Sequence, residues 1–398
     1  MRPEPRELQE LVRELHRQAT PWLPAGSGSR LEWGPPVQPG QGRGPDELVV
    51  LSTARLEGIV EHNPGDFTVT VRAGTPLVVL QQELARHRQW LTVDWPWGTA
   101  EGLGGGTVGG LVARGLAGGF RQRYLGVRDQ LIGIGLLRAD GTAARAGGKV
   151  VKNVAGYDLM RPLCGSWGSL ALITEVTLRT QPLPPQRRGL WLSGPLSGLQ
   201  SMARWLLNSS LSPERLDWHR PGLAPPPAAA LLASLASISA QTLDEQVACI
   251  GEQAHQAGVQ MEALAPDRLE AHLELGRGAA TPRPGWLLRA GVLPSRVPEL
   301  LETPELRGLC AVIGAGSGLG DLWAEAETLP AYRVEALRRR CRALGGQLTV
   351  LRQPAGPEAA IPAWLDAPAR PLIEALKRQF DPKQQLARGR LPGVQPLP

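Results

Sequence analysis

The feature that most constrains this chain is the stretch of residues 96–119, in which glycine recurs far above its usual frequency. Glycine has no Cβ, so a backbone rich in it can approach a ligand closely, at an entropic cost that an ordinary surface loop has no reason to bear. Backbone N–H groups can then face the ligand directly. The stretch therefore predicts close contact with a phosphate or with a flat cofactor.

Segments on both sides of this stretch predict a mixed fold. Upstream, residues 5–19 place leucine and valine at helical spacing, residues 67–71 alternate as in a strand, and a helix with proline in its first turn is expected over 76–88. The loop Pro24–Arg30 contains Gly and Ser and can point successive N–H groups at a pyrophosphate. Downstream, the apolar residues 131–137 predict a strand that ends in a turn.

Two further segments complete this pattern, Lys152–Leu159 and Cys164–Leu178. The order of all these segments resembles the FAD domain of the vanillyl-alcohol oxidase and p-cresol methylhydroxylase (PCMH) type. Within that superfamily, Lys152–Leu159 is most similar to the FAD-binding E subunit of bacterial glycolate oxidase. The resemblance covers about residues 5–182, and the tail Phe380–Pro382 is similar to the closing segment of the family.

The resemblance implies one FAD, bound between a small β–α half and a mostly antiparallel half. We expect it to be non-covalent, because residues 26–30 contain only Gly, Ser and Arg and therefore lack the histidine that carries the flavin in some relatives. Lys152 and Tyr157 either face the flavin or order their own loop. The positions that the resemblance assigns to the cofactor are Gly26, Ser27, Gly28, Ser29, Arg30, Pro96, Gly98, Gly106, Thr107, Val108, Gly109, Gly110, Gly115, Lys152, Gly165, Gly168 and Ile173.

The predicted fold class is α+β, with a two-part FAD domain followed by a ferredoxin-like cap domain. The predicted domains are residues 1–182, a cap domain over 183–370, and a tail of 371–398 that returns to the FAD domain. The block 183–195, rich in Pro and Arg, is interpreted as the boundary. Thr242–Glu245 has the pattern of a capping box that begins a helix.

Composition narrows the chemistry. The four cysteines, Cys164, Cys249, Cys310 and Cys341, are too far apart in sequence for a Cys-x-x-Cys motif or for an iron–sulfur cluster held by this chain alone. The six histidines include no closely spaced pair, so no metal site is predicted. The segment 314–320 resembles a dinucleotide fingerprint but has Leu319 where the pattern requires glycine.

The positive charge is regional, since residues 333–398 hold 12 Lys and Arg against 5 Asp and Glu. No nucleic-acid-binding module accompanies it, so this class of partner is not predicted. A set of arginines within it could bind a carboxylate, although a solvated helix face is favoured: Arg333, Arg338, Arg339, Arg340 and Arg342.

The resemblance implies an FAD-binding subunit of a glycolate oxidase-like complex, which oxidises glycolate to glyoxylate together with a catalytic flavoprotein subunit and an iron–sulfur subunit. No catalytic residue is assigned, because residues 183–398 show no counterpart of the family's His-containing motif. Two alternatives stay open: a self-sufficient FAD-dependent 2-hydroxy-acid or sugar oxidoreductase, and a non-catalytic flavin-binding scaffold. With neither a signal-peptide core nor a membrane span in the sequence, we expect a cytoplasmic protein that its partners can bring to the inner membrane.

Overall fold

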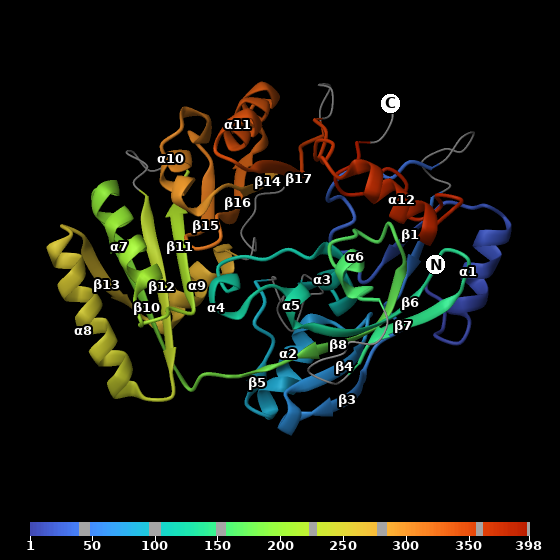
Figure 1. Ribbon diagram of the computed structural model, residues 1–398, viewed down its shortest axis with the longest axis horizontal. Helices are drawn as coiled ribbons and strands as arrows, with labels where there is room; N and C mark the ends of the chain where they lie inside the picture. Colours follow the sequence, from blue (N-terminus) through green and yellow to red (C-terminus); the bar gives the residue numbers. More distant parts are fainter. Residues whose placement is uncertain are drawn as a thin grey trace. The chain divides into compact units, whose positions relative to one another are not determined.

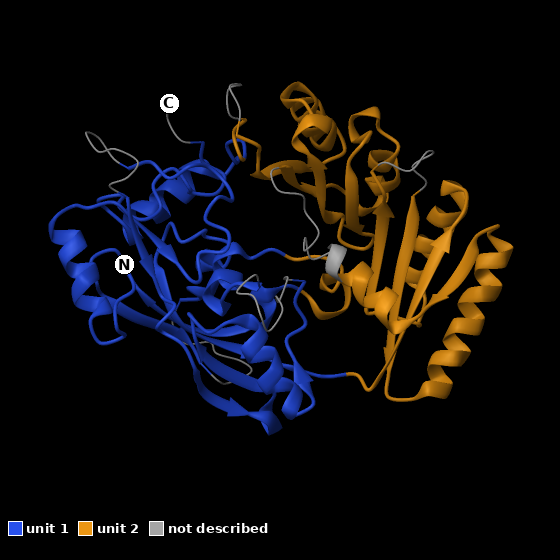
Figure 2. Cartoon of the chain, turned by 180° about the vertical axis from the view of Figure 1, so that it is seen from behind, with its two compact units in different colours: residues 1–116, 126–183, 364–398 blue, residues 117–125, 184–363 orange. Residues whose placement is uncertain are grey.

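The chain forms two compact units in the computed structural model, which describes residues 1–39, 48–94, 105–148, 157–222, 229–276, 285–355 and 361–395. Unit 1 comprises residues 1–116, 126–183 and 364–398. Unit 2 comprises residues 117–125 and 184–363. Figure 2 colours the two units separately. The chain therefore enters unit 2 for residues 117–125, returns to unit 1, enters unit 2 again for residues 184–363, and ends in unit 1.

A small parallel ribbon opens unit 1, formed by β1 (Trp22–Ala25) and β2 (Val49–Ser52). The helix α1 (Leu8–Arg17) covers it. Residues spaced three and four apart lie on one face of a helix, and this apolar face packs beside Trp22 and Leu51; it consists of Leu8, Val12 and Leu15. The helix predicted over residues 5–19 is therefore confirmed, although it spans only Leu8–Arg17.

The main sheet of unit 1 has the order β3-β4-β8-β6-β7, and every neighbouring pair is antiparallel. The helices α2 (Leu77–Arg86) and α3 (Val108–Arg114) pack their buried side chains into one core with this sheet (Figure 1). A short pair, β5 (Gln89–Trp90) with β9 (Gln181–Pro182), extends the unit. The sheet strands are β3 (Ile59–Asn63), β4 (Thr68–Arg72), β6 (Leu131–Leu137), β7 (Ala143–Gly147) and β8 (Leu172–Arg179).

The C-terminal residues return to unit 1 through α12 (Arg370–Phe380). The buried ammonium of Lys377 donates to the Ser169 carbonyl at 2.6 Å and to the Asp381 carboxylate at 2.6 Å. These bonds fasten the helix to the turn that precedes β8. Two short helices, α5 (Val127–Gln130) and α6 (Met160–Leu163), complete the unit.

Unit 2 contains two ferredoxin-like motifs that share one eight-stranded sheet of order β13-β10-β12-β11-β15-β16-β14-β17. Each motif runs strand, helix, two strands, helix, strand, and the two join where β11 pairs antiparallel with β15. The strands are β10 (Gln186–Ser193), β11 (Arg215–Arg220), β12 (Ala230–Ser237), β13 (Gln260–Leu264), β14 (Gly285–Gly291), β15 (Cys310–Gly314), β16 (Leu319–Glu325) and β17 (Gln347–Arg352). The predicted repeated ferredoxin-like topology matches this order.

The two faces of this sheet differ. One face packs against four helices in a single apolar core, namely α7 (Leu196–Asn208), α8 (Ala240–Gln256), α10 (Val297–Leu301) and α11 (Ala331–Ala343). The other face carries polar side chains, because alternate residues of a strand point to opposite sides. The helix α9 (Pro266–Gly276) and the segment 117–125, with α4 (Arg121–Tyr124), belong to that second face.

Several predictions need correction. The block 183–195 is not only a boundary, since β10 occupies most of it and lies between β13 and β12. The helix α8 begins before the predicted capping box, because the Ser239 hydroxyl caps it by accepting from the N–H of Thr242. Unit 2 also contains elements that were not predicted, among them β13, α9 and β16. None of the helices in the described part of the chain combines the length and hydrophobicity that crossing a bilayer requires.

Candidate functional site

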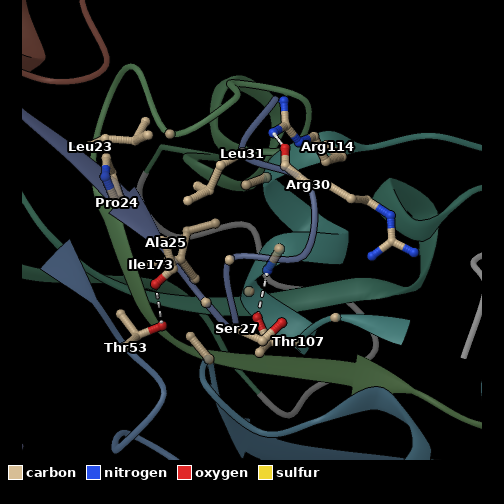
Figure 3. A pocket seen from close by; sticks show the side chains of 18 of the residues that line it. Leu23, Pro24, Ala25, Ser27, Arg30, Leu31, Thr53, Thr107, Arg114 and Ile173 are labelled. Carbon is tan, nitrogen blue, oxygen red and sulfur yellow. Dashed lines mark hydrogen bonds between the residues drawn. The ribbon is translucent and has the colours of Figure 1, made fainter. Parts of the chain in front are cut away.

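A cavity of about 100 Å³ opens in unit 1 beside α3. Its walls come from the loop after β1, from one face of α3, from the turn before β8, and from Arg390 in the C-terminal segment. Figure 3 shows Ser27, Thr107 and Arg114 around it. The volume is several times the minimum that one water molecule needs, so the cavity has room for a small anionic group such as a phosphate.

The loop after β1 forms one wall and needs glycine for two physical reasons. A Cβ on Gly26 would lie 2.1 Å from the Thr107 hydroxyl oxygen, so only hydrogen fits there. Gly28 has φ of +80°, a conformation that L side chains rarely adopt. In the described part of the chain, the backbone N–H groups of Ser27, Gly28 and Ser29 have no acceptor, and the buried Ser27 hydroxyl has no hydrogen-bond partner. These donors are available to an anion.

The first turn of α3 forms the opposite wall, but its N–H groups are already used. Val108 donates to the Thr75 carbonyl at 3.0 Å, and Gly109 donates to the Ala73 carbonyl at 2.8 Å. The Gly110 N–H donates to the Thr107 hydroxyl, which caps the helix. The sequence resemblance implied that this turn supplies backbone donors. In the structure these donors are occupied, and the turn instead lines the cavity with glycines that have no side chains to fill it.

The turn before β8 closes the end of α3. Gly165 donates its N–H to the Val112 carbonyl at 3.0 Å, and Trp167 donates to the Ala113 carbonyl at 2.8 Å. These bonds satisfy carbonyl groups that a helix C-terminus otherwise leaves without partners. Trp167 and Gly168 line the cavity, and so does Ile173 on β8.

Three arginines give the cavity a positive charge: Arg30, Arg114 and Arg390. Burial, followed by repulsion from Arg390 and Arg30, lowers the pKa of Arg114 to about 9. Burial likewise lowers the pKa of Arg390 to about 10. Both pKa values stay above neutral pH, so the guanidinium groups remain charged and favour an anionic occupant.

The structure brings most of the predicted site residues to this one cavity. Those that line it are Gly26, Ser27, Gly28, Ser29, Arg30, Gly106, Thr107, Gly109, Gly110, Gly168 and Ile173. Val108 is buried in the core, while Gly115 and Gly165 support the turn behind the wall. Pro96, Gly98 and Lys152 lie outside the described residues. Sequence reasoning missed Arg114 and Arg390, although Arg114 follows Gly110 by four residues and so shares its helix face.

Two predicted absences concern this site and its surroundings. The described residues that line the cavity include no histidine or cysteine, so none of them offers a usual point of covalent flavin attachment. Within the described ranges, no group of three or more His, Cys, Asp or Glu side chains is placed to hold a metal ion. The non-covalent state of the cofactor stays a prediction.

Comparison with known proteins identifies the unit that holds the cavity. A family model described as an FAD binding domain matches residues 4–147. Residues 4–147 of this chain are thus similar to an FAD binding domain. The resemblance inferred from the sequence and the predicted cofactor, FAD, are thereby confirmed.

Curated proteins similar to this chain each match about half of its length. Glycolate oxidase subunit GlcE of Escherichia coli is 36% identical over 203 residues, which is 50% of this chain and 54% of that subunit. Glycolate oxidase subunit GlcD of Bacillus subtilis is 32% identical over 47% of this chain and 38% of that subunit. D-2-hydroxyglutarate dehydrogenase of Xanthomonas citri pv. viticola is 32% identical over 45% of this chain and 36% of that enzyme. The matched part thus spans about half, or less, of each relative.

Solved structures extend the likeness to the rest of the chain. An alkyldihydroxyacetonephosphate synthase superposes with a TM-score of 0.66 at 13% identity, and the match covers 98% of this chain and 76% of that one. At this identity the match shows the fold alone. It confirms the predicted α+β FAD-binding fold.

The cavity of the FAD binding domain fits the phosphates of FAD. The N–H groups of residues 27–29 and the Ser27 hydroxyl provide donors without partners in the described chain. Arg114 adds a buried guanidinium nitrogen, Nη1, that likewise has none there. Donors of this kind, brought together with positive charge, bind phosphate groups.

Proposed function

We propose that this chain is the FAD-binding subunit of a complex that oxidises a short 2-hydroxy acid, with glycolate as substrate and glyoxylate as product. The observation that carries the proposal is the positively charged cavity, with room for a phosphate, in a chain that is 36% identical over 203 residues to a glycolate oxidase subunit. The names of the other relatives, which include D-2-hydroxyglutarate dehydrogenase and D-lactate dehydrogenases, support the 2-hydroxy-acid class.

The residues of this chain hold and orient the cofactor in this proposal. FAD, when bound, supplies the two-electron chemistry. The loop 26–29 and Arg114 bind its phosphates, while Gly26 and Gly110 leave room for them. The buried sheet of unit 1 keeps these groups in place, since a site on packed elements is held more rigidly than one on a free loop.

Electrons leave the flavin through a partner in this proposal. The four cysteines lie in different places: Cys164 in unit 1, and Cys249, Cys310 and Cys341 in unit 2. Burial raises the pKa of the Cys341 thiol to about 12 and that of Cys164 to about 11, which disfavours the thiolate that a metal requires. An iron–sulfur subunit is therefore proposed as the acceptor.

The test begins with the purified chain and its FAD spectrum. Glycolate is then added anaerobically to the isolated chain and, in parallel, to the chain co-purified with its partners. We expect slow flavin reduction in the isolated chain and fast reduction in the complex. Equal rates in both would favour the self-sufficient oxidoreductase, and no reduction in either would favour the flavin-binding scaffold.

A further inference from the structure

A second cavity in unit 1 lies outside the cofactor site. It has a volume of about 590 Å³ and is lined by the strand β3, by the turn that follows it, and by the helix α2. Its lining residues all fall between positions 57 and 87, and among the described residues it shares none with the cavity beside α3. The proposed binding of FAD therefore gives this second cavity no role.

The cavity is a groove that runs along both elements. At one end, the Gly58 N–H donates to the Thr75 hydroxyl at 2.9 Å. At the other end, the rings of His62 and His87 meet edge to face, with their centroids 4.8 Å apart. β3 and α2 therefore run in the same direction along the two sides of the groove. A strand of 5 residues and a helix of 10 residues are each roughly 15 Å long, and this sets the length of the groove.

One side of the groove is the open edge of a sheet. β3 is the outermost strand of the main sheet of unit 1 (Figure 1), and in the described part of the chain no strand pairs with its other side. Such an edge presents main-chain N–H and C=O groups to which an extended segment of another chain can add. The register of β3 shifts next to Val60. A shift of this kind bends the edge, so a short segment fits it better than a long strand.

The side chains of the groove are apolar and acidic. Ile59 and Val79 line it, and Val79 is 48% exposed although it lies within a helix. Glu57, at one end, is exposed and has no partner among the described residues, while Glu83, toward the other end, pairs with Arg86 at 2.6 Å. The described residues that line the groove include no Lys or Arg. In a chain of net charge +6, the groove is therefore locally acidic and favours a cationic partner.

We propose that this groove docks an extended segment of a partner subunit, with Lys or Arg at two positions four residues apart and an apolar residue midway between them. Alternate residues of an extended chain face the same side, and four residues span about 13 Å. The two cations then reach the carboxylates of Glu57 and Glu83, while the apolar residue covers Val79. The inference rests on the proposed function for the existence of a partner subunit, and it adds the surface at which that partner docks.

The experiment uses the full chain with its FAD bound and a labelled peptide, Gly-Arg-Thr-Val-Thr-Arg-Gly, whose binding is followed by fluorescence anisotropy. The native chain should bind this peptide about tenfold or more tightly than the peptide in which both Arg are replaced by Glu. Methylation of the peptide's backbone nitrogens should abolish binding, because it removes the donors that pair with the strand edge. Glu57→Lys, which replaces attraction by repulsion at an exposed site, should weaken binding by about threefold to tenfold. Val79→Gln should weaken it by about threefold, because less apolar surface is buried.

The matched control is Glu252→Lys, which reverses the same charge at an exposed position of α8 in unit 2 and should leave the affinity unchanged. Equal binding of the Arg and Glu peptides, or equal affinity of the native chain and Glu57→Lys, overturns the proposal. A dimer of this chain that Glu57→Lys dissociates also overturns it, because the groove would then hold a second copy. The native chain gives an independent reading, since added salt must weaken binding of the Arg peptide. None of these readings uses glycolate, so a failure here is distinct from a failure of the proposed oxidation.

Discussion

Buried or half-buried arginines occur in both units, and their surroundings differ. On the polar face of the sheet in unit 2, Arg187 pairs with Glu214, Arg215 pairs with Asp217, and Arg289 pairs with Asp321 at 2.8 Å. In the cavity of unit 1, the described chain places no salt-bridging carboxylate beside Arg114. The first region neutralises its charges internally, whereas the second leaves positive charge facing a cavity.

This difference separates structural charges from binding charges. Charges within a protein must be paired, because burying a lone ion costs several kcal/mol. The pairs of unit 2 meet this requirement without a ligand. In the cavity of unit 1, the buried Nη1 of Arg114 has no hydrogen-bond partner in the described part of the chain, so an anion can complete its bonding. The comparison thus predicts that charge removal in unit 2 harms folding, whereas charge removal in the cavity harms binding.

The largest effect is expected for Asp217→Ala in unit 2. Arg215 and Asp217 are both fully buried, so the variant leaves Arg215 in the interior without this partner. Breaking a buried pair typically costs about 3–5 kcal/mol, and the free energy of unfolding should fall by that amount in denaturant titrations. Asp158→Ala, in an exposed pair with Arg128, should cost less than about 1 kcal/mol. Equal losses in the two variants would contradict the comparison.

The second-largest effect is expected for substitutions of glycines in α3, and it tests whether FAD binds in the cavity. A Cβ on Gly110 would meet only the Thr107 hydroxyl, at 3.4 Å, so a valine fits the protein but narrows the cavity. A Cβ on Gly109 would lie 2.8 Å from the Ala73 Cβ, so a valine there strains the protein itself. Overpacking costs about 1–3 kcal/mol.

Gly110→Val should therefore weaken FAD binding by about tenfold to a hundredfold with little change in the melting temperature of the apo chain. Gly109→Val should instead lower that melting temperature. The measurements are fluorescence titration of FAD and thermal unfolding of the apo chain. Unchanged FAD affinity in a folded Gly110→Val chain would show that FAD does not bind in this cavity.

The comparison also shows which parts of the site a sequence can reveal. Gly26 and Gly110 were predictable, because close backbone approach requires glycine and the resemblance fixes the order of the loops. Arg390 was not, since it comes from the far end of the chain and no local pattern links it to residues 26–30. Arg114 could have been predicted, because it follows Gly110 by four residues and so lies on the same face of the helix.

The fold likewise contains elements that the sequence predicts and elements that it does not. Periodic helices such as α1 and α2 were predictable, because their apolar residues repeat at helical spacing. β10 was not predicted because it contains arginines, of which the half-buried Arg187 forms an ion pair with the buried Glu214. Long-range pairing of this kind has no signature in a local window. The start of α8 was misplaced because both Ser239 and Thr242 have the chemistry of a cap, and only the structure shows which one accepts.

A smaller effect is expected from His219, which lies on the polar face of unit 2 beside Trp191 and His272. Burial, followed by repulsion from Arg215 and His272, lowers the pKa of His219 well below its usual value. Below about pH 6.5, the unfolded chain therefore binds a proton that the folded chain does not, and stability falls as the pH drops. His219→Gln should remove about 1 kcal/mol of the loss between pH 6.5 and about 5.5. His255→Gln, on the exposed part of α8, should leave this slope unchanged.

The smallest effect is expected for arginines of α11 whose side chains are exposed to solvent. Arg338 does not belong to them, because it is buried and donates to the Pro362 and Ala363 carbonyls. Arg339 and Arg342 are exposed on α11, so their charge costs the fold little and is available to an acidic partner surface.

Changing both Arg339 and Arg342 to Glu should weaken co-purification of the proposed partners a few-fold at low salt, since an exposed ion pair contributes about 0.2–1 kcal/mol. The difference should vanish at high salt, because screening removes such interactions. FAD occupancy should stay native, since both residues belong to unit 2 and the cavity lies in unit 1. Loss of flavin in this variant would show that FAD binding also depends on charges of unit 2, which would contradict the comparison. Partner binding equal to native at every salt concentration would instead place docking on another face.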